Sequence, residues 1–147
     1  MSQLEQNREE RDPSQAPATE VKSHSGSLLI VEDDHAVRSF VSLATSRLGY
    51  NVLEAANGME ALKLIEEHGG KITLVLTDYN MPGMNGVQLV QALKKRPVVP
   101  AIAVMSGRFE PIMMNALKAE GITALLGKPF SSEKLGSVLK SAIATKV

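Results

Sequence analysis

Five short apolar runs alternate along the chain with segments in which apolar residues recur at helical spacing. The first run, Leu28 to Val31, is continuous, which is typical of a strand covered on both faces. The same reasoning predicts four further strands, over residues 52–55, 72–77, 101–105 and 124–126. The helical spacing predicts helices over residues 37–48, from Gly58 to about Gly69, and over 87–93, 111–117 and 135–143.

This strict alternation predicts an α/β fold: a doubly wound, five-stranded parallel sheet with helices on both faces. The pattern alone does not give the strand order. Residues 1–26 are rich in Gln, Glu, Arg, Ser and Pro and hold few aliphatic residues, so we expect a disordered N-terminal tail there. Residues 27–147 then form a single domain.

Composition excludes several classes of function. The 16 Lys and Arg residues equal the 16 Asp and Glu residues in number, and no stretch concentrates basic charge, so nucleic acid and membrane surfaces are not expected partners. The chain has no cysteine, which removes disulfides and thiolate chemistry. No apolar run approaches the roughly 20 residues of a membrane helix, and we expect a cytoplasmic protein.

Polar residues suited to phosphoryl chemistry follow four of the predicted strands. They are Glu32-Asp33, Asp78, Ser106 and Lys128. Because the carboxyl ends of parallel strands meet at one edge of a sheet, we expect these side chains to converge on one site. A carboxylate such as Asp78 can attack phosphorus to form an acyl phosphate, and a cluster of carboxylates favours a hard cation that neutralises it.

The motifs resemble those of the receiver domain of two-component response regulators. The resemblance rests on Val31-Glu32-Asp33-Asp34 followed by Arg38, on Asp78 to Gly86, on Ser106-Gly107 and on Lys128-Pro129-Phe130. It covers about residues 27–147. It implies the flavodoxin-like strand order 2-1-3-4-5 and a cis bond before Pro129.

The resemblance also implies a role for each candidate site residue. Asp78 is the expected phosphoacceptor, and Ser106 and Lys128 are expected to hold phosphoryl oxygens. The expected cofactor is Mg²⁺, with Asp33 and Asp78 as direct ligands, Glu32 binding through water and Asn80 binding through its backbone carbonyl.

Three acids stand in a row after the first strand, and Arg38 helps to choose between them. In the family, an Arg of the first helix usually follows the second metal acid by five residues, which selects Glu32 and Asp33. Asp34 is then expected to cap the following helix.

The methionines and histidines of the chain are not expected to take part in the chemistry of the site. Met84, Met105, Met113 and Met114 are expected to be packing residues rather than ligands, and His24, His35 and His68 to lie at the surface or at helix ends. Receiver domains usually carry Tyr or Phe three residues before the Lys of the fifth strand, where this chain has Leu125. We therefore expect a switch that is weaker or that runs mainly through the loop around Arg108 and Phe109.

The sequence thus predicts a stand-alone response regulator that accepts a phosphoryl group from a histidine kinase on Asp78 and signals by binding a downstream protein effector. It is not expected to turn over an external substrate. One alternative is a relay intermediate or phosphate sink that passes the group to a histidine phosphotransfer protein. Two further alternatives are a phosphorylation-independent binding module and a Mg²⁺-dependent phosphatase of the haloacid-dehalogenase type.

Overall fold

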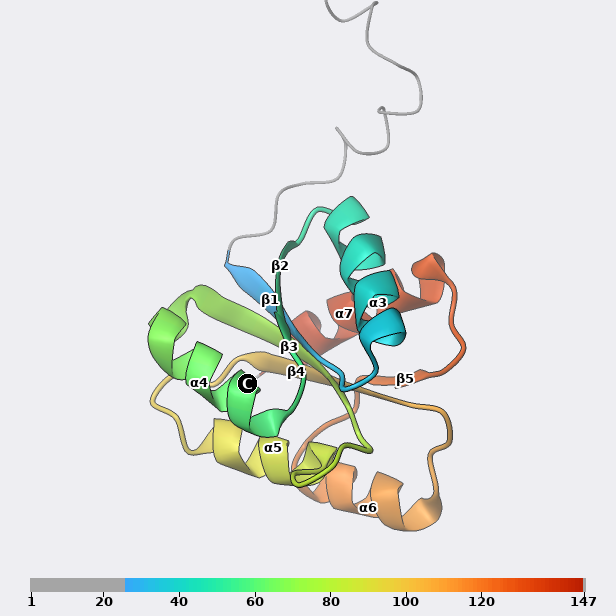
Figure 1. Cartoon of the computed structure of the whole chain (residues 1–147). Helices are drawn as coiled ribbons and strands as arrows, with labels where there is room; N and C mark the ends of the chain where they lie inside the picture. The colour runs from blue at the N-terminus through green and yellow to red at the C-terminus, as the bar shows by residue number, and fades with distance from the viewer. Residues whose placement is uncertain (1–25, 147) are drawn as a thin grey trace, which may run out of the picture.

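The computed structural model describes residues 26–146, which form a single layered α/β unit (Figure 1). The strands are β1 (Ser27–Val31), β2 (Asn51–Ala55), β3 (Ile72–Asp78), β4 (Ala101–Ser106) and β5 (Leu125–Gly127). The helices are α3 (His35–Arg47), α4 (Gly58–His68), α5 (Gly86–Lys94), α6 (Pro111–Ala119) and α7 (Ser132–Ala144), with a 3₁₀ turn, η2, at Gly69–Lys71. The predicted tail over residues 1–26 lies almost wholly outside the described residues.

The five strands pair in parallel in the order β2-β1-β3-β4-β5, so the fold class and the strand order are confirmed. Two layers of helices cover the sheet, with α3 and α7 on one face and α4, α5 and α6 on the other (Figure 1). The chain reverses its direction of winding at β1, which places the carboxyl ends of β1 and β3 at the centre of one edge.

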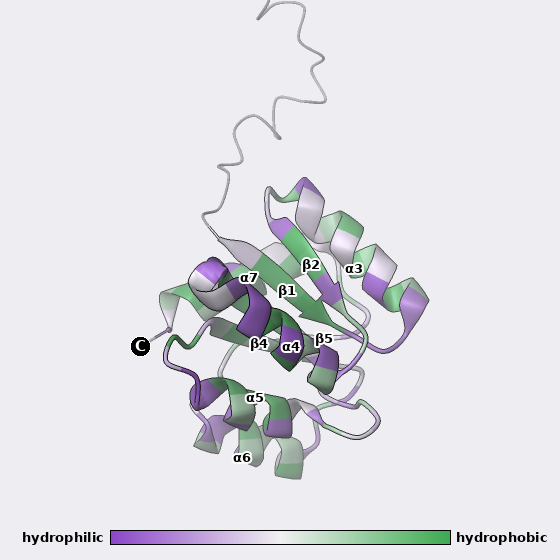
Figure 2. Cartoon of the chain, turned by 60° about the vertical axis from the view of Figure 1, so that its left-hand side comes forward, coloured by the Kyte–Doolittle hydropathy of each residue, from purple (hydrophilic) through white to green (hydrophobic). Residues whose placement is uncertain are grey.

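Alternate residues of the strands pack into two separate apolar layers, one on each face of the sheet. Leu28 and Ile30 of β1 pack with the α3 and α7 side, while Leu29 and Val31 pack with the α4, α5 and α6 side. All four side chains are fully buried, which explains why the run is apolar without interruption. Figure 2 shows the same arrangement as hydrophobic strands enclosed by helices that carry their polar residues outward.

The observed elements differ from the predicted ones mainly at their ends. β3 and β4 each extend by one residue, to Asp78 and Ser106, and β5 begins one residue later than predicted, at Leu125. α3 begins at His35 because the Asp34 side chain accepts a hydrogen bond from the Val37 amide. The cap predicted for Asp34 is therefore confirmed.

The expectations for the other residues are confirmed in part. Met105 and Met113 are buried and Met84 is partly buried, but the prediction for Met114 is wrong, since that side chain is 45% exposed. His35 is exposed and His68 ends α4, whereas His24 lies outside the described residues. The bond between Lys128 and Pro129 is cis, as the resemblance implied. Within residues 26–146, no helix has the length and apolar character needed to cross a membrane.

Gly86 brings the start of α5 directly against the end of β3. Its amide donates a hydrogen bond of 2.7 Å to the Tyr79 carbonyl. A Cβ at this position would lie 3.0 Å from Tyr79 Cα and 3.3 Å from the Asp78 carbonyl oxygen, which are backbone atoms that cannot move aside as a side chain would. This close approach fixes the backbone around Asp78.

We therefore expect Gly86→Ala to lower the free energy of unfolding by about 1–3 kcal/mol, the usual cost of forcing an extra methyl group into a packed contact. Urea unfolding would measure this difference. Gly136→Ala in α7 is the matched control, because a Cβ there would meet only the Leu48 side chain at an ordinary distance of 3.5 Å. In that helix interior, alanine is expected to stabilise the protein by roughly 0.5–1 kcal/mol. Equal unfolding midpoints for the two variants would contradict the interpretation.

Candidate functional site

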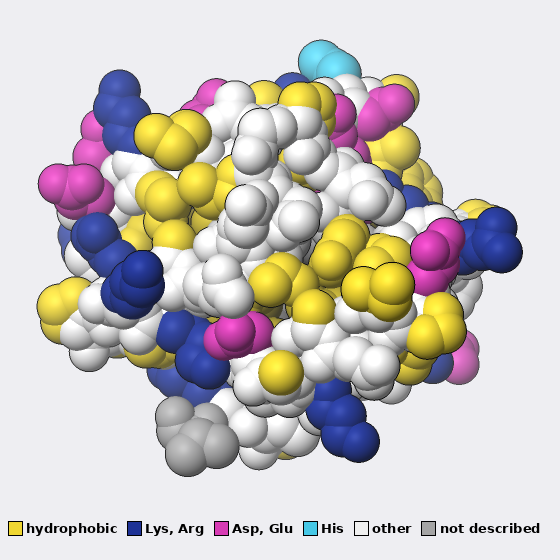
Figure 3. All heavy atoms as spheres, turned by 90° about the horizontal axis from the view of Figure 1, so that it is seen from below, with side chains coloured by type: hydrophobic (Ala, Val, Ile, Leu, Met, Phe, Trp, Pro, Cys, Tyr) yellow, Lys and Arg dark blue, Asp and Glu magenta, His cyan; other side chains and the backbone are white. Residues whose placement is uncertain are grey.

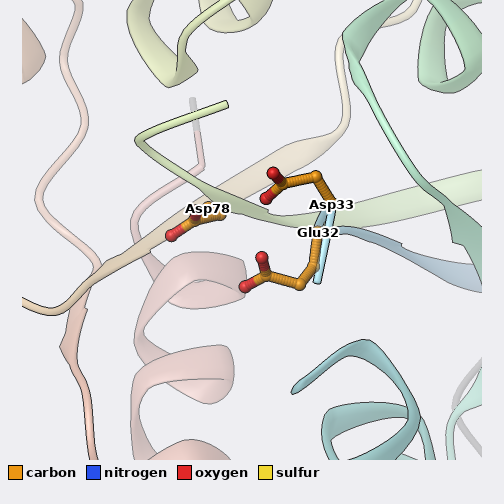
Figure 4. A group of neighbouring side chains, drawn as sticks. All are labelled: Glu32, Asp33 and Asp78. Atoms are coloured by element: carbon orange, nitrogen blue, oxygen red, sulfur yellow. The ribbon is translucent and has the colours of Figure 1, made fainter. Parts of the chain in front are cut away.

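Three carboxylates gather at the central edge of the sheet. Glu32 and Asp33 follow β1 directly, and Asp78 ends the neighbouring strand β3. One carboxylate oxygen from each residue lies within 4.8 Å of the others, and Figure 4 shows the three side chains gathered beside the ends of the two strands. Glu32 and Asp78 are buried, while Asp33 is exposed and leaves the cluster open to solvent on one side.

The Lys128 ammonium lies between two of these carboxylates. Its Nζ atom is 2.6 Å from Glu32 Oε1 and 3.1 Å from Asp78 Oδ1. Lys128 follows β5 and is 96 positions beyond Glu32 in the sequence, and its amide donates a hydrogen bond of 2.8 Å to the Ser106 carbonyl. The fold therefore brings together one cation and three acids from three separate strand ends.

Burial and charge shift the titration of the buried groups. Burial raises the pKa of the Asp78 carboxyl, and the nearby charge of Asp33 adds to that rise, while Lys128 opposes it. Burial likewise raises the pKa of Glu32 despite its hydrogen bonds to Lys128 and to the Asp34 amide. Burial works to lower the pKa of Lys128, but the hydrogen bonds and charges of Glu32 and Asp78 together outweigh it and raise that pKa.

Ser106 and Asn80 occupy the same edge but do not join the carboxylate cluster. The Ser106 hydroxyl donates to the Arg108 carbonyl at 2.9 Å and accepts from the Arg108 amide at 3.2 Å. Asn80 is exposed in the loop after β3, two residues beyond Asp78. Of the six predicted site residues, the structure thus gathers four in one cluster, while Ser106 ends the neighbouring strand β4 and Asn80 lies in the loop after β3.

The structure adds contacts that the sequence argument missed. The Asp34 amide donates to Glu32 Oε2 at 3.2 Å, and the Arg38 guanidinium donates to the Glu32 carbonyl at 2.8 Å and to Glu54 Oε1 at 3.2 Å. Glu54 is the one acidic residue in the Val52-Leu53-Glu54-Ala55 stretch, so a charge inside an otherwise apolar strand was the available signal for it. Arg38 had entered the argument only as a spacing marker.

The donor atoms of the cluster suit a small, hard divalent cation. All three groups offer carboxylate oxygen, which Mg²⁺ prefers to nitrogen or sulfur, and the open side at Asp33 leaves room for the waters that Mg²⁺ usually keeps. A divalent cation would also relieve the repulsion among acids that a single ammonium cannot neutralise. The residues present therefore fit Mg²⁺.

A five-stranded sheet of order 2-1-3-4-5 that gathers acids and a lysine at this edge defines the class of signalling receiver domains. A family model described as "Response regulator receiver domain" matches residues 28–140, and the chain belongs to this family. Membership of this family favours the receiver interpretation over the haloacid-dehalogenase alternative. Receiver domains accept phosphoryl groups from histidine kinases and usually bind Mg²⁺ at an acidic site.

Several curated relatives are similar over most of the chain. A chemotaxis protein CheY homolog of Campylobacter jejuni is 35% identical over 122 residues, which cover 80% of this chain and 92% of that protein. The sensor kinase CckA of Brucella abortus is 37% identical over 121 residues, or 82% of this chain, but the match spans only 13% of that protein. Sporulation initiation phosphotransferase F of Bacillus subtilis is 27% identical over 81% of this chain and 94% of its own length.

Among solved structures, the chemotaxis protein CheY4 of Vibrio cholerae has a TM-score of 0.72 and 30% sequence identity. That alignment covers 81% of this chain and 99% of the other. The fold and the family thus agree with the interpretation of the motifs.

Replacing Asp78 with Asn should stabilise the metal-free protein at neutral pH. Because the pKa of Asp78 is raised in the folded state, its contribution to stability is present at low pH and is lost as pH rises through the folded-state pKa. We expect Asp78→Asn to unfold at a higher temperature than the wild type at about pH 7, and the difference to disappear near pH 3, where an aspartyl group is protonated in both states.

Thermal unfolding followed by circular dichroism in the presence of a chelator would test this expectation. Glu67→Gln, on the exposed side of α4, is the control for loss of an acidic charge and should show no comparable gain. An Asp78→Asn variant less stable than the wild type at neutral pH would count against the electrostatic argument.

Proposed function

We propose that Asp78 is the phosphoacceptor of a response regulator, and that Mg²⁺ is held by Asp33 and Asp78 directly, by Glu32 through water and by the Asn80 backbone carbonyl. The observation that supports this most directly is the position of Asp78, whose carboxylate lies 3.1 Å from the Lys128 ammonium and shares a cluster with two further acids. A nucleophilic carboxylate needs this cationic surrounding, because an incoming phosphoryl group is itself negative.

The reaction is a transfer of the phosphoryl group from phosphohistidine to Asp78. One Asp78 carboxylate oxygen forms a bond to phosphorus, the P–N bond of the donor breaks, and its electron pair returns to the imidazole nitrogen. Lys128 holds one phosphoryl oxygen and the Ser106 hydroxyl donates to another. Bound Mg²⁺ supplies charge neutralisation for the phosphoryl oxygens and the acids. The protein's contribution is positioning and electrostatic stabilisation, which is what such transfers require.

Phosphorylation changes the hydrogen bonding of Ser106 and thereby the loop after β4. A hydroxyl has a single proton to donate, and here the Arg108 carbonyl accepts it at 2.9 Å. A Ser106 that donates to a phosphoryl oxygen releases the Arg108 carbonyl. Leu125, which occupies the position where the family usually has an aromatic residue, is partly buried against the core and has no ring to reorient. The signal therefore leaves the site mainly through residues 107–110.

The output is phosphorylation-dependent binding to a protein, with a histidine kinase as the donor and the cytoplasm as the location. An exposed apolar surface supports a protein partner. α6 exposes Ile112 by 82% and Met114 by 45%. Figure 3 views the side on which α6 lies in Figure 1 and shows apolar side chains reaching the surface there. The expectation of a stand-alone regulator without external turnover stays a prediction.

Incubation with acetyl phosphate and Mg²⁺ should add one phosphoryl group to the protein, as measured by intact-mass spectrometry. Asp78→Asn should show no adduct, and removal of the metal by a chelator should suppress the adduct in the wild type. Asp33→Asn should slow its formation by at least about tenfold, because replacing even a residue that only orients a metal ligand usually costs 10- to 100-fold.

Asp34→Asn is the matched control, since asparagine also caps helices well and the α3 cap is thereby preserved. It should be phosphorylated nearly as fast as the wild type. An adduct that persists in Asp78→Asn would refute the proposed acceptor, and a loss of activity in Asp34→Asn equal to that in Asp33→Asn would refute the choice of metal acids.

The same phosphorylated protein distinguishes the relay alternative, which the similarity to sporulation initiation phosphotransferase F favours. Rapid transfer from Asp78 to a histidine phosphotransfer protein, with return of the original mass, would indicate a relay intermediate or phosphate sink. A phosphorylated state that persists in the presence of that protein and binds an effector would indicate the output role.

Hydrogen exchange in the loop after β4 should report the change at Ser106. The Arg108 amide donates to Ser106 Oγ at 3.2 Å, so it loses its acceptor when that hydroxyl turns to a phosphoryl group. We expect its exchange to become about fivefold faster on phosphorylation, corresponding to loss of a hydrogen bond worth roughly 1 kcal/mol. Exchange measured by mass spectrometry over residues 107–110 would test this.

In Ser106→Ala, the Arg108 amide should exchange quickly with or without the phosphoryl group, because its acceptor, the Ser106 hydroxyl oxygen, is missing in both states. Leu125→Tyr should extend the response to β5 and alter partner affinity. Identical exchange of the wild-type loop in the two states would show that the signal takes another route.

A further inference from the structure

The turn that carries Glu32 and Asp33 is tied to the edge strand β2 through both backbone groups of Glu32. The Glu32 amide donates to the Ala55 carbonyl of β2 at 3.0 Å. The Glu32 carbonyl accepts a hydrogen bond of 2.8 Å from Arg38 Nη1. This peptide position is thus held from two sides at the point where the chain leaves the sheet.

Arg38 is itself anchored to the same strand. Its Nε atom donates to Glu54 Oε1 at 3.2 Å, and the Arg38 side chain is only 17% exposed. Two donors on one rigid, planar guanidinium therefore bridge β2 and the acid turn at fixed geometry. A lysine ammonium could reach either partner but has no planar fork with which to hold both in this arrangement.

Asp33 has no comparable support of its own. Among the hydrogen bonds and ion pairs of residues 26–146, none involves the Asp33 carboxylate, and the side chain is exposed. Its direction therefore depends on the backbone of the turn. Glu32 differs, because Lys128 and the Asp34 amide hold its two carboxylate oxygens at 2.6 Å and 3.2 Å.

We propose that Arg38 is a positioning residue for the metal site: by holding the Glu32 carbonyl against β2, it directs the Asp33 carboxylate toward Asp78 and so raises the affinity for Mg²⁺. This inference rests on the proposed function, since it assumes that the acid cluster binds the cation. Arg38 touches neither the cation nor the phosphoryl group.

The direction in which Mg²⁺ affinity changes when Arg38 is replaced distinguishes a positioning role from a purely electrostatic one. Arg38 is a cation beside a cation site, so as a charge alone it opposes Mg²⁺ binding, and its removal would tighten that binding. As a positioning residue it does the reverse, and its removal weakens binding. Arg38→Lys keeps the charge and loses the two-point contact, so only the positioning role predicts a loss of affinity in that variant.

Isothermal titration calorimetry with MgCl₂ measures the effect without any phosphoryl transfer. We expect Arg38→Ala to weaken Mg²⁺ binding by about tenfold, which is the lower end of the range for residues that orient metal ligands. Arg38→Lys should weaken it by at least about threefold. Glu54→Gln keeps an accepting oxygen for Arg38 Nε but loses the charge that strengthens that hydrogen bond, so it should weaken Mg²⁺ binding by a smaller factor. Arg47→Ala is the matched control, because it removes the same charge from the exposed last turn of α3 and should leave the affinity unchanged or slightly higher.

Circular dichroism would verify that each variant is folded before titration. If Arg38→Ala does not fold, Arg38→Lys and Glu54→Gln decide the question. Mg²⁺ affinity in folded Arg38→Ala equal to or above that of the wild type would overturn the inference, as would a wild-type affinity in Arg38→Lys. A wild-type protein that binds no Mg²⁺ would instead overturn the proposed function together with the inference.

Discussion

The contact on which the site depends is the Lys128 ammonium between the buried carboxylates of Glu32 and Asp78, at 2.6 Å and 3.1 Å. Buried acids of like charge repel one another and lose their hydration, so they tolerate such proximity only beside a cation. Burial raises the pKa of Asp78, the charge of Asp33 adds to that rise, and the single ammonium of Lys128 does not offset both. This incomplete neutralisation makes the edge of the sheet both costly to fold and well suited to a divalent ion.

The sheet topology supplies the geometry that this charge arrangement needs. β1 and β3 lie side by side because the winding reverses between them, and their ends deliver Glu32, Asp33 and Asp78 to one place. Gly86 then allows the start of α5 to approach the backbone of Asp78 and Tyr79 closely. The apolar layers on both faces therefore act on the site indirectly, by fixing where the strands end.

The sequence predicted the fold and most of the site because each strand is a short apolar run with a chemically distinctive residue after it. It predicted less where the outcome depends on contacts across the fold. The bridge from Arg38 to Glu54 follows from the pairing of β1 with β2. The hydrogen bond that the Ser106 hydroxyl donates depends on where the Arg108 backbone carbonyl lies. Met114 was misplaced because it adjoins Met113 on α6, and neighbouring helical positions point about 100° apart, so only one of the two faces the sheet.

The strand that leads to Lys128, β5, is short, and this affects the charge balance of the carboxylate cluster. This edge strand has only three residues, pairs with β4 alone, and leads directly to Lys128. Edge segments with few backbone hydrogen bonds open locally at a lower free-energy cost than central strands do. Local opening of β5 would therefore withdraw the Lys128 ammonium from Glu32 and Asp78, while these acids stay at the ends of the central strands and would be left open to cations from solution.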